Sequence, residues 1–174
     1  ILAYLNADDC YYPGTVRRVV DYCEAHPEAD VVYGALQIVD EQGRPIGSPV
    51  EIPDASTAWL LRYPLPQPTM FLRRRVVEQI GWLDPTLHYV FDWELCLRAA
   101  LKGVRFGRLA GPPLAMFRSW PGQKTANHFE RHVEEQQRMR DRLMAMPTLP
   151  QRMARAIAFS KAWAFLWPAY QHTF

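Results

Sequence analysis

The sequence predicts an α/β fold in which a mixed sheet is flanked by helices, with further helices at the C-terminal end. Three observations support this class. The chain opens on an apolar run over residues 1–5, which ends in a polar, acidic turn. An amphipathic helix follows over residues 13–26, with its apolar side chains at helical spacing. Residues 31–39 are then rich in strand-forming side chains. This order is typical of sheets covered by helices.

The opening run has the composition of a strand that is buried on both faces. All five of its residues are apolar, as in strands of parallel sheets that helices cover on both sides. Such a strand needs neighbouring strands, and these should precede it in the chain. We therefore expect this chain to be the downstream part of a longer α/β domain whose earlier strands precede residue 1.

Turn residues and prolines divide the middle of the chain. Residues 41–44 predict a turn that reverses the preceding strand into a hairpin near Ile46. Asp54 is placed to cap a short helix over residues 55–62. Three prolines within residues 64–68 predict an extended segment on a surface or at the rim of a cleft.

Glycines mark the ends of the later helices. A helix over residues 73–80 is closed by Gly81, and one over residues 92–102 is closed by Gly103. Two more helices are predicted near the C-terminus, over residues 127–146 and 151–167.

Composition narrows the class of protein. The 174 residues are 49% hydrophobic and 22% charged, which excludes a disordered chain. A net charge of +2 does not indicate a nucleic-acid partner. The three cysteines form no CxxC or zinc-ligand pattern, so a reducing compartment is favoured. With neither a signal peptide nor an apolar run of about 18 residues, we expect a cytoplasmic protein that is soluble or peripheral to a membrane.

The acidic turn after the first run is the first candidate site. Asn6, Asp8 and Asp9 follow a predicted buried strand, at the edge where open α/β sheets bind ligands. Oxygen ligands of this kind suit Mg²⁺ or Mn²⁺ held together with phosphates. Alternatively, one of the two aspartates caps the helix that begins near Pro13.

Asp92 is the second candidate. As a helix N-cap it has an ordinary structural role, with Glu94 favourable to the helix dipole. Lodged among Tyr89, Phe91 and Trp93, its charged form is also expected to be desolvated, which raises a carboxyl pKa and suits a general base. The two roles are compatible, because one oxygen can cap while the other faces a cleft.

Several motifs stand in a fixed order over residues 1–126. They are AYLNADD (3–9), YPG (12–14), HPEADVVYG (26–34), QPTMF (67–71), GWLD (81–84), FDWELCLR (91–98) and FRSWPGQKT (117–125). Together they resemble the middle of the family 2 glycosyltransferases, which have the GT-A fold. The resemblance implies an inverting transferase that moves a sugar from a nucleotide-diphosphate donor to an acceptor hydroxyl, as in the synthesis of cell-surface glycans.

The resemblance also implies roles on the donor side. Asp8 and Asp9 match the acidic metal motif and would hold Mg²⁺ or Mn²⁺ against the donor diphosphate. Asn6 stands where many members carry another aspartate, and would lie beside the donor. Trp120 stands where many members have a histidine that helps to bind the metal or the diphosphate. An indole cannot ligate a metal. Either Lys124, Ser119 or water takes the place of that histidine, or the metal site is weaker than in other members. Alternatively, Trp120 is only a packing residue.

On the acceptor side, the resemblance implies that Asp92 is the general base. Glu94, Gln67 and Trp93 would bind or orient the acceptor, which is a glycan or a lipid-linked sugar. The family's upstream half, with the pocket for the nucleotide base, is not matched, so we expect the isolated chain to bind donor poorly and to be inactive or weakly active. The alternative function is a non-catalytic remnant that binds a sugar or a partner. A metal phosphohydrolase is a third and weaker hypothesis, because it explains only the acidic turn.

Residues 127–174 lie beyond the resemblance and predict a C-terminal helical extension. The helix over residues 151–167 mixes basic and aromatic side chains. It is therefore a candidate for peripheral contact with the inner face of the plasma membrane, beside a lipid-linked acceptor. Packing against the rest of the domain is the alternative.

Overall fold

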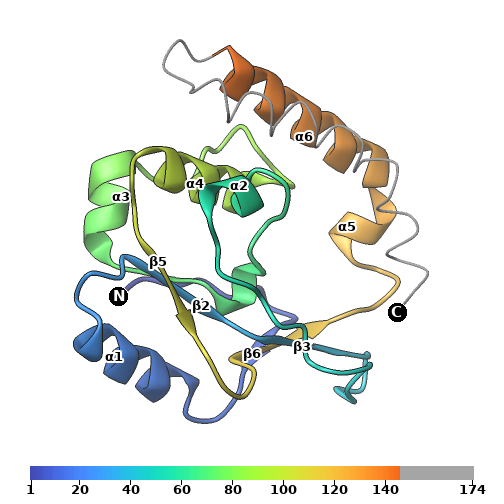
Figure 1. Cartoon of the computed structure of the whole chain (residues 1–174). Helices are drawn as coiled ribbons and strands as arrows, with labels where there is room; N and C mark the ends of the chain where they lie inside the picture. The colour runs from blue at the N-terminus through green and yellow to red at the C-terminus, as the bar shows by residue number, and fades with distance from the viewer. Residues whose placement is uncertain (146–174) are drawn as a thin grey trace.

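The computed structural model describes residues 1–145, which form a mixed α/β arrangement with two small sheets (Figure 1). In the first sheet the strand order is β4-β2-β5, with β2 antiparallel to β4 and parallel to β5. In the second the order is β1-β6-β3, with β6 antiparallel to β1 and parallel to β3. The strands are β1 (Cys10–Tyr11), β2 (Val31–Gly34), β3 (Leu36–Val39), β4 (Phe71–Leu72), β5 (Phe106–Leu109) and β6 (Ala115–Arg118).

The two sheets meet where the chain passes from β2 to β3. The sequence predicted one strand over residues 31–39, but the strand is interrupted at Ala35, whose carbonyl accepts the N–H of Leu114 at 2.8 Å. The approach is close at Gly34, where an added Cβ would lie 2.7 Å from Leu114 Cδ1. The chain therefore moves from one sheet to the other at a position that requires glycine.

Helices cover both faces of the first sheet (Figure 1). Adjacent residues of β2 point to opposite faces, as expected of a strand. Val32 packs in a cluster with Val19 of α1, and Val31 packs in a cluster with Val76 of α3 and Leu95 of α4. The helices are α1 (Thr15–Ala25), α3 (Arg74–Ile80) and α4 (Phe91–Leu101), close to the predicted ranges. The expected α/β class is confirmed at this level.

The largest buried cluster joins α4 to segments far along the chain. Trp93 and Leu97 of α4 pack with Leu60 of α2, and Met139 and Leu143 of α6 pack in the same cluster. The remaining helices are α2 (Thr57–Leu60), the 3₁₀ helix η1 (Gln67–Thr69), α5 (Lys124–Asn127) and α6 (Phe129–Met144). The helix predicted over residues 127–146 is thus α6, preceded by the short α5.

The opening run is not the buried strand that the sequence predicted. It forms one antiparallel bridge, between Leu2 and Leu72, and Ile1 is 52% exposed. The physical reason is that β4 is only two residues long and offers the run a single pairing.

Two cap predictions and one loop prediction are wrong. Ser56, not Asp54, caps α2, because its side chain accepts the N–H of Trp59. Val90, not Asp92, is the N-cap residue of α4, and Asp92 lies in the first turn. The proline segment ends in the 3₁₀ helix η1, which tolerates Pro68 near its start.

Two predictions concern the C-terminal region and the membrane. The predicted helix over residues 151–167, with its proposed membrane contact, lies outside the described residues. Within residues 1–145, no helix has both the length and the apolar character that crossing a bilayer requires.

Candidate functional site

The acidic turn is held by the start of the second sheet. Asp9 is only 8% exposed; its Oδ1 accepts the backbone N–H of Arg118 at 3.1 Å and its Oδ2 accepts the Asn6 amide at 3.2 Å. The Arg118 side chain donates to the carbonyl of Asp8 at 3.1 Å. Burial raises the pKa of Asp9, and the two hydrogen bonds oppose that rise. The carboxylate of Asp9 is therefore fixed in position.

Asp8 is contacted by the side chain of Trp120. The indole Nε1 of Trp120 donates to Asp8 Oδ2 at 3.1 Å, and the ring is 40% exposed. A side chain at Gly122 would put a Cβ 1.8 Å from the Trp120 ring, so only glycine permits this placement. Trp120 is thus a hydrogen-bond donor to Asp8 rather than only a packing residue.

The turn offers a divalent cation a small set of oxygens. Within residues 1–145, no group of three or more His, Cys, Asp or Glu side chains is arranged to hold a metal. Mg²⁺, however, is commonly held by one or two carboxylates that are completed by water and substrate phosphates. Among the described residues Asp8 Oδ1 receives no hydrogen bond, whereas both oxygens of Asp9 accept one. The residues fit such a site with Asp8 as the direct ligand and Asp9 beside it.

A chain of contacts leads from the acidic turn to the start of α4. The amide of Asn6 donates to Gln67 Oε1 at 3.1 Å, and Gln67 donates to the carbonyl of Tyr4 at 2.5 Å. The Tyr4 ring lies 6.0 Å from the ring of Phe91, the first residue of α4. Gln67, predicted on the acceptor side, is 7% exposed and holds the acidic turn through its hydrogen bond with Asn6.

Asp92 is half-buried in the first turn of α4, and its Oδ1 accepts the N–H of Trp93 at 2.7 Å. Burial raises the pKa of Asp92 to about 6, despite the hydrogen bond. The pKa of Tyr4 is also raised, by burial and then by the negative charge of Asp92. Among the described residues, the buried Tyr4 hydroxyl has no hydrogen-bond partner. A carboxylate with a pKa near neutrality is suited to accept a proton.

A second link joins the two candidate sites through residues 120–124. Trp120 contacts Asp8 at one end, and the chain then turns, with Gln123 N–H donating to the Trp120 carbonyl at 3.1 Å. At the other end, Lys124 Nζ donates to the His88 carbonyl at 2.7 Å. The ends of such a turn are within about 7 Å of each other. Residues 120–124 therefore connect the acidic turn to the loop before α4 through the side chains of Trp120 and Lys124. Lys124, predicted on the donor side, contacts this loop.

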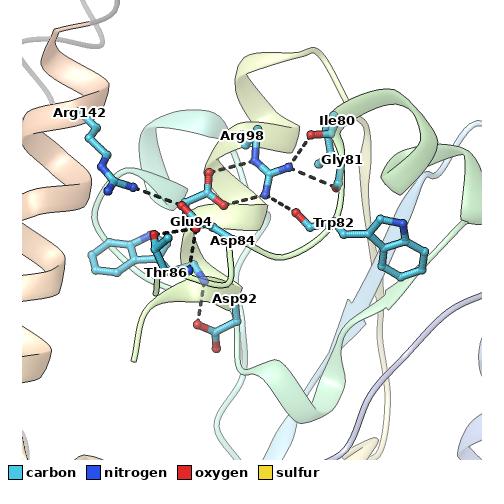
Figure 2. A network of polar contacts seen from close by, with 10 residues as sticks. Ile80, Gly81, Trp82, Asp84, Thr86, Asp92, Glu94, Arg98 and Arg142 are labelled. Carbon is cyan, nitrogen blue, oxygen red and sulfur yellow. Dashed lines mark hydrogen bonds and ion pairs between the residues drawn. The ribbon is translucent and has the colours of Figure 1, made fainter. Parts of the chain in front are cut away.

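Glu94 is engaged in a network on another side of α4 (Figure 2). Its two oxygens accept Arg98 Nε at 2.9 Å and a terminal nitrogen of Arg98 at 2.7 Å. Arg98 also donates to the carbonyls at the end of α3 and just after it, those of Ile80, Gly81 and Trp82. This geometry favours a role for Glu94 in fixing α3 against α4 over direct contact with an acceptor.

Trp93 is a core residue. It is 3% exposed, and its indole donates to the carbonyl of Leu60 at 2.6 Å. The guanidinium of Arg140 lies over its ring, 5.4 Å from the centroid. A direct contact between Trp93 and the acceptor, as predicted, has almost no exposed surface available to it.

Glu135 is a further residue of this region that the sequence did not indicate. This glutamate of α6 is 3% exposed and accepts the backbone N–H groups of His88, Tyr89 and Val90, the shortest at 2.7 Å. It does for α4 what an N-cap side chain does, because Val90 itself provides no cap. No local pattern distinguishes Glu135 from the other acidic residues of α6, so the sequence carries no signal of this role.

The raised pKa of Asp92 gives a testable dependence of stability on pH. Because the folded state raises this pKa from 3.8 to about 6, the stabilising contribution is complete below pH 3.8 and is lost as the pH rises through 6. We expect Asp92→Asn to have a free energy of unfolding about 3 kcal/mol above the wild type at pH 7.5, and to match it near pH 4. Urea unfolding at the two pH values measures the difference.

Asp84→Asn is the control of opposite sign. Hydrogen bonds from Thr86 lower the pKa of Asp84, so its contribution is present at neutral pH and lost as the pH falls. The asparagine variant should therefore be less stable than the wild type at pH 7.5. A gap between Asp92→Asn and wild type that is equal at both pH values would contradict the assignment.

Comparison with known proteins adds no family: no family model matches the chain, and no curated protein matches it either.

Proposed function

We propose that this protein is an inverting glycosyltransferase with a GT-A fold, acting on a nucleotide-diphosphate sugar and the hydroxyl of a glycan or lipid-linked acceptor. Two features support the proposal: the motifs over residues 1–126, and the contacts that link the acidic turn to the segments around Asp92. The observation that carries the proposal is that two separate sets of contacts connect the acidic turn with the segments around Asp92. Asn6, Gln67 and Tyr4 connect them on one side, and residues 120–124 connect them on the other.

In this proposal each group has a chemical task. Asp8, with Asp9 fixed beside it, holds Mg²⁺ or Mn²⁺; the bound metal supplies Lewis-acid stabilisation of the departing nucleoside diphosphate. Asp92 accepts the proton of the acceptor hydroxyl as that oxygen attacks the anomeric carbon. A pKa of about 6 leaves it ionised at neutral pH yet basic enough to take the proton.

We place the protein in the cytoplasm, where nucleotide sugars are made available, and propose no nucleic-acid partner because the net charge is only +2. Residues 151–167, with their basic and aromatic side chains, are proposed to contact the inner face of the plasma membrane.

Metal-dependent donor binding tests the proposal. In titration calorimetry of the full-length protein with a panel of nucleotide-diphosphate sugars, we expect saturable binding in the presence of Mn²⁺ and none in EDTA. Asp8→Ala should weaken that binding at least tenfold, because it removes a carboxylate whose Oδ1 accepts no hydrogen bond among residues 1–145. Asp21→Ala, a half-exposed aspartate of α1, is the matched control and should bind like wild type.

A second candidate is a sugar-binding or partner-binding domain without catalysis. It is favoured by the hydrogen bonds that protein groups already make to Asp8 and Asp9. Sugar binding that is indifferent to Mn²⁺, to EDTA and to Asp8→Ala would support this second candidate and count against the transferase.

A further inference from the structure

A pocket of about 420 Å³ lies beside the loop that precedes α4 and belongs to neither the acidic turn nor Asp92. Residues from the loop, α5 and α6 line it: His88, Tyr89, Lys124, Arg131, Glu134, Glu135 and Arg138. Five of these seven side chains carry a formal charge. The pocket is large enough for a charged group and its nearest atoms, and so far it has no assigned ligand.

Two arginines of this pocket form no salt bridge among residues 1–145. Arg131 and Arg138 are seven residues apart on α6, two turns of helix, so they lie on the same side. Within residues 1–145, neither forms an ion pair, although Glu134 stands between them on the same helix. Two guanidinium groups are therefore available to a ligand.

The other charged groups are already held in place. Lys124 donates to the His88 carbonyl at 2.7 Å and lies 4.7 Å from the centroid of the Tyr89 ring. Both oxygens of Glu135 accept backbone N–H groups from the loop, so its charge is directed at the start of α4. Glu134 is then the one exposed carboxylate opposing three cations in the pocket.

Arginine side chains recognise phosphate through paired N–H donors. A neutral sugar needs no positive charge for its recognition, whereas this pocket has two arginines and a lysine. We propose that this pocket binds a phosphate group carried by the acceptor. Tyr89 lines the pocket and precedes Asp92 by three residues, so a phosphate held here places the attached acceptor beside α4. The assignment of the phosphate to the acceptor rests on the proposed function. The affinity of the pocket for phosphate is argued from its arginines and does not depend on that function.

Titration calorimetry with inorganic pyrophosphate in EDTA tests the pocket without any metal. We expect saturable binding to the wild type, weakened roughly tenfold or more by Arg131→Gln and by Arg138→Gln, since each removes charge-assisted hydrogen bonds. Arg17→Gln, a highly exposed arginine of α1, is the matched control for net charge and should bind like wild type. Asp8→Ala should also bind like wild type, because the acidic turn is not part of the pocket.

A second arm distinguishes two sources of the phosphate. Sedimentation with vesicles of phosphatidylglycerol and phosphatidylcholine in equal parts, if it depends on both arginines, supports the pocket and assigns the phosphate to a lipid. Pyrophosphate binding without vesicle binding supports the pocket and assigns it to a soluble phosphate ester. No saturable binding in either arm, or equal losses in Arg17→Gln, overturns the pocket. Intact pocket binding with no transferase activity would instead refute the proposed function alone.

Discussion

Asp92→Asn is expected to lower turnover by roughly 10²- to 10⁴-fold, the contribution typical of a general base. The reason is that the amide cannot accept the proton of the acceptor hydroxyl, although its oxygen can still accept the N–H of Trp93. The affinity for the donor should be almost unchanged, because Asp92 contacts neither Asp8 nor Asp9 in the hydrogen-bonded network of the turn. Steady-state kinetics of the full-length protein, with donor binding measured separately, provide the test.

The pH profile separates this role from a structural one. In the wild type, kcat/KM should rise with pH through a value near 6, as Asp92 ionises. The residual activity of Asp92→Asn should lack that rise. Asp84→Asn, a partly exposed carboxylate on the loop before α4, is the control and should keep both the turnover and the profile. Near-normal turnover in Asp92→Asn would remove the assignment.

The elements that the sequence predicted well are those with local signals. The amphipathic spacing of α1 and the strand-forming side chains of β2 are patterns of neighbouring residues, and both elements are present. The glycines at 81 and 103 have φ of 85° and 76°, which explains why they mark the ends of α3 and α4 so reliably.

The predictions that failed depend on residues far apart in the sequence. Residues 1–5 have the composition of a buried strand, but their pairing is decided by β4, which is too short to continue it. Asp92 has the right residue type for an N-cap, yet the loop N–H groups before α4 point to Glu135, more than forty residues later. No local pattern contains that information.

The candidate site was predicted unevenly for the same reason. The acidic turn and Asp92 could be found as short motifs. The contacts of Asp8 and Asp9 with Asn6, Arg118 and Trp120 favour a common site for the two aspartates. The hydrogen bond from Trp120 to Asp8 could not be foreseen, because it depends on Gly122 leaving space for the indole. Nor could the positions of Glu94 and Trp93, whose partners are Arg98 and the carbonyl of Leu60.

The buried carboxylate of Glu135 leads to the second large expected effect. Glu135→Ala should lower the free energy of unfolding by about 3 kcal/mol or more, because three backbone N–H groups before α4 lose a charged acceptor. Glu135→Gln, which keeps one oxygen but loses the charge, should lower it by about half as much. The measurement is the urea midpoint and slope of each variant.

Glu134→Ala is the matched control, since Glu134 is adjacent but exposed and should change stability by less than about 0.5 kcal/mol. Because the loop held by Glu135 leads directly into α4, the glutamine variant, if still folded, should also lower kcat more than it raises KM, by misplacing Asp92 rather than by losing substrate contacts. Equal stabilities for Glu135→Ala and Glu134→Ala would mean that water replaces the carboxylate at the start of α4. The position of Asp92 would then have to depend on other contacts, among them its hydrogen bond with the Trp93 N–H.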